Sequence, residues 1–202
     1  MRILINTTSP YARVARIALR EKGLPAEEEI VDPWGDTPAL LAVNPSARVP
    51  AVIAPSGAPL TESLLAVLWL EHAHPTPPLI GADADRDISR AGLAYGVIEA
   101  SVHTLVGRNI ISGSIGDPAF DATRIGLRRR RTIANGLAAL DADPPGHDTP
   151  APGLGAICAI VALDYPRFRF PGAPWMPPCP ALDALCAAYA DRPSIRDTRP
   201  HA

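Results

Sequence analysis

The segment Asn44-Pro-Ser-Ala-Arg-Val-Pro-Ala-Val52 places Pro50 at the start of a short apolar strand, and Glu62-Ser63 follows shortly after it. Proline has no N–H to donate to a sheet, so within a sheet it stands at an edge, at a first residue or at a bulge. An X-Pro bond also adopts the cis form at low cost, about 0.5–1 kcal/mol. We expect a cis Val49-Pro50 turn that leaves the N–H and C=O of Val49 free to pair with an extended peptide.

Glu62-Ser63 opens the strongly apolar segment Leu64–Leu70, which we predict to be a helix. A helix N-terminus that carries a hydroxyl group is a ready site for an anion, and the adjacent carboxylate can hold an ammonium group. Together with the backbone groups of Val49, these features describe a site for a small zwitterionic peptide.

Residues 1–76 combine short apolar strands with helices bounded by proline and glycine. The predicted elements are a strand over Met1–Asn6, a helix over Pro10–Lys22, a strand over Glu28–Val31, a short helix or turn over Asp36–Ala42, a hairpin of Ala51–Ile53 and Ala58–Leu60, and a helix over Glu62–His72. This order is that of a thioredoxin-like domain in which the proline turn precedes the third strand.

Residues 77–82 are predicted to be a linker, and residues 83–202 an all-helical C-terminal domain. The predicted helices cover Asp83 to Ile111, Pro118–Leu140, Leu154–Leu163 and Pro180–Tyr189. Helical periodicity places Ile125, Leu127, Ile133, Leu137 and Leu140 on the buried side of the second of these helices. The predicted fold class is therefore an α/β thioredoxin-like domain followed by an all-α domain.

Composition limits the possible partners. A chain of 202 residues with a net charge of −2 gives no electrostatic argument for nucleic acid or a membrane surface. The apolar run at the N-terminus is too short for a signal peptide, so we expect a soluble, cytoplasmic protein. Three cysteines and five histidines, His147 among them, show no metal-ligand spacing. The run Arg128–Arg131 would point in several directions on a helix, which favours a solvated or interface surface.

The motifs above, with Thr7-Thr-Ser-Pro-Tyr-Ala-Arg-Val-Ala-Arg-Ile-Ala-Leu-Arg-Glu-Lys-Gly23, resemble the glutathione S-transferase family over nearly the whole chain. Tyr165-Pro-Arg-Phe-Arg-Phe-Pro171 is similar to a stretch found in a bacterial branch of that family. The resemblance implies a glutathione-binding N-terminal domain, a helical domain with part of the electrophile pocket, and a homodimer. It also implies glutathione as co-substrate without a metal, and a role in detoxification.

Ser9-Pro10 lies where the first strand gives way to the first helix, a place that favours negative charge. A free thiol has a pKa near 8.5, so only about 3% is thiolate at neutral pH. Lowering that pKa by about two units requires roughly 2.7 kcal/mol, which a hydroxyl donor and a helix N-terminus can supply. Ser9 would donate to the glutathione sulfur, with Thr8 as the second choice. The alternative is that Ser9 only caps the helix.

Other site residues follow from the resemblance by position. Val49 would pair its backbone with the cysteinyl part of glutathione next to the cis residue Pro50, and Arg48 would lie near the glycyl carboxylate. Glu62 and Ser63 would hold the γ-glutamyl amine and carboxylate. For Glu62 the alternative is a favourable charge in the first turn of a helix.

Two further positions are candidates for the electrophile pocket: Tyr11, read as pocket wall, and His103, on the helix that would flank the cleft. The chain also departs from the family at a capping box that usually begins a buried helix, where Gly153 and Ala156 stand here. Neither side chain can cap, so the cap must come from elsewhere or the helix is less stable.

Three classes of function remain open at this level. The first is a transferase that conjugates glutathione to a small hydrophobic electrophile. The second is a glutathione-dependent isomerase or dehalogenase, which needs the same thiolate. The third is a non-catalytic binding or regulatory protein of the same fold, for which Ser9, Glu62 and Ser63 would have no necessary role. Disulfide exchange is excluded, because Ser9-Pro10-Tyr11-Ala12 resembles the Cys-Pro-Tyr-Cys motif of glutaredoxins without either sulfur.

Overall fold

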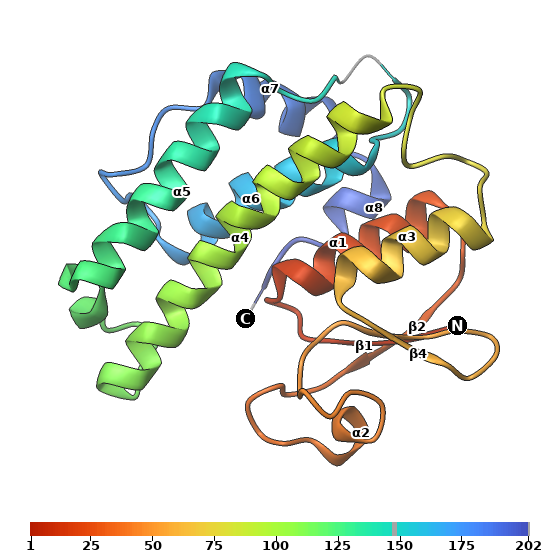
Figure 1. Cartoon of the computed structure of the whole chain (residues 1–202), viewed down its shortest axis with the longest axis horizontal. Helices are drawn as coiled ribbons and strands as arrows, with labels where there is room; N and C mark the ends of the chain where they lie inside the picture. Colours follow the sequence, from red (N-terminus) through yellow and green to blue (C-terminus); the bar gives the residue numbers. More distant parts are fainter. Residues whose placement is uncertain (147–148, 202) are drawn as a thin grey trace.

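The structure is a computed structural model that describes residues 1–146 and 149–201 (Figure 1). His147 and Ala202, which the sequence predictions include, lie outside the described residues. The elements are β1 (Arg2–Ile5), α1 (Pro10–Glu21), β2 (Glu27–Ile30), α2 (Pro38–Leu41), β3 (Ala51–Ile53), β4 (Pro59–Thr61), α3 (Ser63–Ala73), α4 (Ala84–Ser112), a 3-10 helix η1 (Pro118–Ala122), α5 (Arg124–Ala142), α6 (Leu154–Arg169), α7 (Pro180–Ala188) and α8 (Pro193–Arg196).

The four strands form one sheet in the order β2-β1-β3-β4. β1 pairs in parallel with β2 and antiparallel with β3, and β3 pairs antiparallel with β4. Successive side chains of β1 point to opposite faces: Ile3 and Ile5 join the main core, whereas Leu4 packs with Leu40 of α2. Helices α1 and α3 cover one face and α2 lies on the other (Figure 1). This is the predicted thioredoxin-like arrangement.

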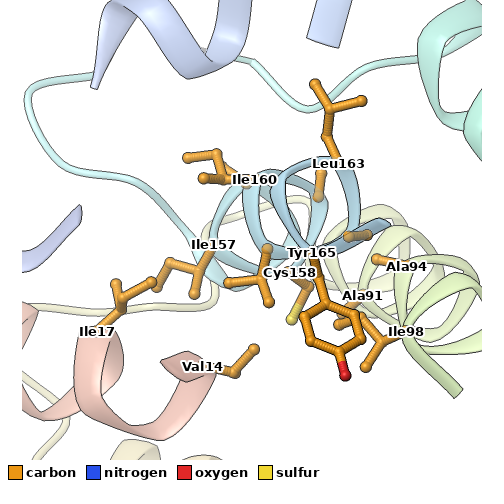
Figure 2. Packing of buried hydrophobic residues seen from close by; sticks show 14 of the residues in the cluster. Val14, Ile17, Ala91, Ala94, Ile98, Ile157, Cys158, Ile160, Leu163 and Tyr165 are labelled. Atoms are coloured by element: carbon orange, nitrogen blue, oxygen red, sulfur yellow. The ribbon is translucent and has the colours of Figure 1, made fainter. Parts of the chain in front are cut away.

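Helix α6 lies at the centre of the helical part, between α1 and α4 (Figure 2). All its residues from Leu154 to Leu163 are buried. Val14 and Ile17 of α1 face Ile157 of α6, and Ala91, Ala94 and Ile98 of α4 lie on its other side (Figure 2). One apolar core therefore joins the sheet layer to the helical part. Within the described residues, every helix is too short or too polar to span a bilayer.

Two predicted helix boundaries in the helical part were wrong. The helix predicted over Pro118–Leu140 is broken at Thr123, whose Oγ1 accepts a hydrogen bond from Gly126 N at 3.0 Å and begins α5. Helix α6 does not end at Leu163 but continues to Arg169 with Pro166 inside it. Tyr165 and Pro166 are buried in this last part of the helix, although proline has no N–H to donate to the helix.

The buried side predicted for α5 was partly wrong. Ile133, Leu137 and Leu140 are fully buried, but Ile125 and Leu127 are 46% and 44% exposed. Gly126 takes the inward position between them, because a Cβ there would lie 2.2 Å from the carbonyl oxygen of Phe120. The restart of the helix at Thr123 brings its first turn so close to η1 that only glycine fits.

The ammonium group of Lys22 lies at the junction of α1, α3 and the segment that follows α3. Its side chain is fully buried, pairs with Glu71 of α3, and donates to the carbonyl oxygens of His74 and Pro77, both at 2.7 Å. Glu71 also accepts from the N–H groups of Leu79 and Ile80. Burial alone would raise the pKa of Glu71, but the hydrogen bonds from Lys22 and the two backbone groups outweigh it and lower that pKa.

The carboxylate of Asp87 on α4 lies beside the N-terminus of helix α6, where the capping box of the family is missing. Asp87 Oδ1 of α4 lies 3.1 Å from the place that a Cβ of Gly155 would occupy, and Leu154 N donates to Leu79 O at 2.7 Å. A negative charge near the first turn of a helix is favourable. The glycines at Gly153 and Gly155 leave room for the Asp87 carboxylate, which accepts a hydrogen bond from Gly81 N at 3.2 Å; among the described residues no side chain caps α6 by a hydrogen bond.

Replacing Lys22 with Met should destabilise the protein strongly. Removing one partner of a buried ion pair costs about 3–5 kcal/mol, which for a chain of this size corresponds to a fall in Tm on the order of 10 °C. Thermal unfolding followed by circular dichroism measures the change. Arg2→Met, which removes a half-exposed partner of Glu29, is the control and should change Tm little.

The difference in stability between wild type and Lys22→Met should depend on pH. The pKa of Glu71 is lowered in the folded protein. Its contribution to the free energy of unfolding is therefore complete above the ordinary pKa of 4.5, and it is lost as the pH falls through the lowered pKa. The difference in stability between wild type and Lys22→Met should therefore narrow in acid. A difference that stays constant down to the acid transition would contradict this assignment.

Replacing Asp87 with Ala should destabilise the protein by about 1 kcal/mol, since a carboxylate near a helix N-terminus is worth roughly 0.3–2 kcal/mol. Asp85→Ala, in the same turn of α4 but exposed, is the matched control. Urea unfolding measures both. Equal effects of the two substitutions would show that Asp87 does not act on α6.

Candidate functional site

A cavity of about 800 Å³ opens where the turn after β1, the loop before β3 and the start of α3 face α4 and the end of α6. Every site residue predicted from the sequence lines it: Thr8, Ser9, Tyr11, Arg48, Val49, Pro50, Glu62, Ser63 and His103. These positions come from segments far apart in the chain. The structure thus brings the predicted residues together in one place, although their individual roles are a separate matter.

Ser9 stands at the N-terminus of α1 with its side chain in the cavity. Its Oγ accepts a hydrogen bond from Ala12 N at 3.2 Å, so Ser9 is the N-cap of the helix. A hydroxyl group that accepts in this way keeps its own proton available for donation. Capping and donation to a ligand are therefore compatible uses of the same side chain.

The hydroxyl groups of the two neighbouring threonines are already engaged. Thr8 Oγ1 donates to Asn6 Oδ1 at 2.8 Å, and Thr8 N donates to the same oxygen at 3.0 Å. Thr7 Oγ1 donates to His201 O at 2.9 Å. Asn6 organises the turn that presents Ser9, because its side chain accepts both hydrogen bonds from Thr8. Of the three hydroxyl groups in this turn, that of Ser9 alone has no acceptor among the described residues.

The loop before β3 presents backbone groups to the cavity. The Val49–Pro50 bond is cis, and no hydrogen-bond partner of Val49 N or O is found in the described part of the chain. Asn44 holds the loop in shape, because its Nδ2 donates to Arg48 O at 2.8 Å and its Oδ1 accepts from Ser46 N at 3.1 Å. An extended peptide placed in the cavity could pair with Val49.

Glu62 holds a strained backbone conformation, with φ of 62°, immediately before α3. Its carboxylate does not cap the helix but lies 3.3 Å from Arg48 Nη1, in a pair whose side chains are 72% and 60% exposed. Strained positions of this kind cluster at ligand sites, and Ala47, with φ of 53°, lines the same cavity. The geometry directs the charge of Glu62 toward the cavity.

Ser63 is almost fully buried, and its Oγ lies 2.8 Å from the hydroxyl oxygen of Tyr95 on α4. The rings of Tyr11 and Tyr95 are 6.0 Å apart in a tilted arrangement. Burial, and to a lesser extent Glu99, raises the pKa of Tyr11, so its hydroxyl group stays protonated at neutral pH. Burial likewise raises the pKa of Tyr95. Both tyrosines can donate hydrogen bonds but not act as bases.

The far wall of the cavity comes from α4 and α6. His103 Nδ1 lies 3.7 Å from Glu99 Oε1 on α4, and both side chains are about half exposed. Arg169 at the end of α6 also lines the cavity. Within residues 1–146 and 149–201, no cluster of His, Cys, Asp or Glu is arranged to hold a metal.

Sequence reasoning did not predict that Tyr95 contacts Ser63 or that Arg169 lines the cavity. Packing between helices brings both side chains to the site, and the Tyr165–Pro171 stretch that contains Arg169 pointed to the family but not to a place in the cavity. Asn6 was predicted only as the end of the first strand, although its position before a turn is typical of asparagine.

Comparisons with known proteins agree with this geometry. Residues 8–73 match the family model described as the N-terminal domain of glutathione S-transferase. Maleylacetoacetate isomerase of Pseudomonas aeruginosa is 27% identical over 203 residues, which cover 96% of this chain and 92% of that protein. A probable glutathione transferase of Aplysia californica is 38% identical over 77 residues, or 38% of this chain and 83% of that protein.

Among solved structures, a glutathione S-transferase of Methylobacterium radiotolerans in complex with glutathione sulfonate superposes with a TM-score of 0.87. It is 33% identical, and the alignment covers 100% of this chain and 95% of that one. The sequence match and the shared fold extend over nearly the whole chain, and the predicted site residues line one cavity. The chain belongs to the glutathione S-transferase family.

Proposed function

We propose that this protein is a glutathione transferase in which the hydroxyl group of Ser9 holds the glutathione sulfur as a thiolate. The observation that carries the proposal is the free proton of Ser9 at the N-terminus of α1, inside a cavity that also presents peptide-binding groups. The engagement of Thr8 with Asn6 favours Ser9 over Thr8 as the donor.

The N-terminus of α1 and the Ser9 hydroxyl group act on the sulfur together. The helix N-terminus places partial positive charge near the sulfur, and the Ser9 hydroxyl group would add a hydrogen bond to the charged form, which lowers the pKa of a thiol. Because Ala12 N already fixes the Ser9 side chain, little reorganisation is needed when the ligand binds. The thiolate then forms a bond to an electrophilic carbon, whose leaving group departs with the bonding electron pair.

The remaining groups fit the rest of glutathione. The N–H and C=O of Val49, which have no partner in the described part of the chain, can pair with the cysteinyl part. Glu62 can hold the γ-glutamyl ammonium group and Arg48 a carboxylate; their exposed ion pair is weak enough to rearrange. If the Tyr95 hydroxyl group donates to Ser63 Oγ, the Ser63 proton is directed to the γ-glutamyl carboxylate.

Tyr11 and His103 fit the wall of an electrophile pocket, since both line the cavity on the side of α4. A homodimer, a cytoplasmic location, a role in detoxification and the domain boundaries at residues 76 and 83 stay predictions of the sequence. The exposed side chains of Leu65 and Leu68 on α3, 61% and 44% accessible, are apolar surface of the kind that a homodimer would cover.

Ser9→Ala should abolish most turnover while glutathione still binds. Removal of one preorganised donor to a developing or stabilised anion costs about 10²-fold or more in rate. The pKa of bound glutathione, followed by the ultraviolet absorbance of the thiolate, should rise toward the ordinary value near 8.5. Calorimetry should show an almost unchanged affinity for glutathione.

Thr8→Val is the discriminating variant, because it removes the hydroxyl group next to that of Ser9 in the same turn of the cavity wall. It should leave the pKa of bound glutathione low. A thiolate retained in Ser9→Ala but lost in Thr8→Val would move the catalytic role to Thr8. Glutathione that binds neither wild type nor variant would overturn the proposal altogether.

A glutathione-dependent isomerase is the second candidate, because the relative that aligns with 96% of this chain is named maleylacetoacetate isomerase. An isomerase adds the thiolate to an electron-poor double bond and expels it again after rotation, so glutathione is regenerated. A transferase consumes one thiol for each product molecule.

Measuring free thiol against product therefore separates the two activities. We expect a stoichiometric loss of thiol with an aryl halide, and no loss during cis–trans isomerisation of an activated alkene. If the protein turns over alkenes at constant thiol but leaves aryl halides unchanged, the isomerase assignment replaces the transferase assignment.

A further inference from the structure

A second cavity, of about 670 Å³, adjoins the first. Leu105, Ile115 and Arg169 line both cavities, so the two spaces meet at these side chains. The second cavity extends away from the Ser9 turn, between the end of α4, η1 and the segment that follows α6. A molecule whose reactive carbon lies near Ser9 could therefore reach the border at Arg169.

The second cavity has more positive than negative charge in its lining. Asp121 is buried and pairs with both Arg108 and Arg130; Arg108 Nε lies 2.9 Å from Oδ1, and Arg130 Nη2 lies 2.9 Å from Oδ2. One carboxylate thus faces two guanidinium groups. Burial would raise the pKa of Asp121, but the hydrogen bonds from both arginines outweigh it and keep that pKa low.

Arg169 adds a third positive charge, at the border between the two cavities. No carboxylate of the described residues lies within ion-pair distance of it, and its buried Nε atom has no hydrogen-bond partner there. Its guanidinium carbon lies 4.8 Å from the ring centre of Phe168 and 5.5 Å from that of Tyr165. Aromatic rings therefore hold Arg169 in place without neutralising it.

Aromatic rings also line the second cavity. Phe170 and Trp175 both contribute to its wall, with Arg108 stacked 5.0 Å from the first ring and Arg130 5.7 Å from the second. Planar apolar surface next to guanidinium groups that outnumber the one carboxylate among them suits an aromatic or unsaturated group that carries a carboxylate.

We propose that the electrophile carries a carboxylate distal to its reactive carbon, and that Arg169 binds this carboxylate at the border of the second cavity. The proposal rests on the proposed function, because it assigns a substrate class to the site where glutathione would be activated. It makes Arg169 a specificity-determining residue that acts through substrate binding and not through the thiolate.

The negative charges that face the same space do not cancel this attraction. Glu62 is paired with Arg48, and Glu99 lies next to His103 with its side chain 56% exposed, where solvent screens it. Arg169, in contrast, is partly buried between aromatic rings, where screening is weaker.

Binding of glutathione conjugates tests the inference without a need for turnover. The probes are S-(4-carboxybenzyl)glutathione and its neutral carboxamide analogue, with a second pair in which a biphenyl group lengthens the spacer. Calorimetry on the wild type should give at least one pair in which the carboxylate binds about tenfold more tightly, as expected for one charge-assisted contact. Arg169→Met should remove that preference and leave the carboxamide affinity unchanged, whereas Arg169→Lys should keep part of it.

Arg167→Met is the matched control. Arg167 carries the same charge on the same helix, but it pairs with Asp183 on the exposed side and lines neither cavity. Equal affinity of wild type for carboxylate and carboxamide in both pairs, or an equal loss for both in Arg169→Met, would overturn the inference.

The failure of this inference and that of the proposed function are distinguishable. If glutathione and the carboxamide conjugates bind but the carboxylate brings no gain, the substrate class is wrong and the glutathione site stands. If free glutathione does not bind, both are overturned.

Discussion

Helix α1 and its C-cap carry four charged residues whose side chains are at most 6% exposed, and much of the structure follows from this constraint. Its charged groups have these partners: Arg13 pairs with Asp164 of α6, Arg16 with Glu28 of β2, Glu21 with Arg192, and Lys22 at its C-cap with Glu71 of α3. Charges that are buried need such partners. The partners come from the sheet layer and from the helical part. Pairing the charged groups of α1 therefore also fixes how the two parts join, and it holds Ser9 at the helix N-terminus.

The elements around Ser9 were predictable because their signals are local. Pro10 at a first helical turn, Gly23 after a helix, and the proline turn before β3 each fix backbone geometry within a few residues. The same signals brought the predicted residues of the first cavity together. Where helices depend on distant partners, the sequence was less informative: the break at Thr123 and the Asp87 carboxylate against α6 involve packing that periodicity does not encode.

The turn at Ser9 shows why a capping role and a catalytic role need not be alternatives. Capping uses a lone pair of Oγ to accept from Ala12 N, whereas thiolate stabilisation would use the proton on the same oxygen. The hydroxyl group of Thr8 donates to Asn6 and that of Thr7 to His201 O. Among the described residues, the hydroxyl group of Ser9 is therefore the one in this turn without an acceptor, and its oxygen is already held by Ala12 N. Sequence patterns could name the three hydroxyl residues but could not decide between them, because the decision depends on which acceptors the folded turn supplies.

The two ends of the cavity present different kinds of groups to a ligand. On the side of the sheet, the groups that face the cavity are largely backbone: the N–H and C=O of Val49 and the strained turns at Ala47 and Glu62. On the side of the helices they are side chains, from Tyr11 and Tyr95 near Ser63 to Arg169 at the border of the second cavity. Backbone recognition depends on turns that few substitutions preserve, whereas a side chain on α4 or α6 can change without altering the fold. We therefore expect α4 and α6 to determine the identity of the electrophile, and Arg169 is the residue there with no carboxylate of the described residues within ion-pair distance.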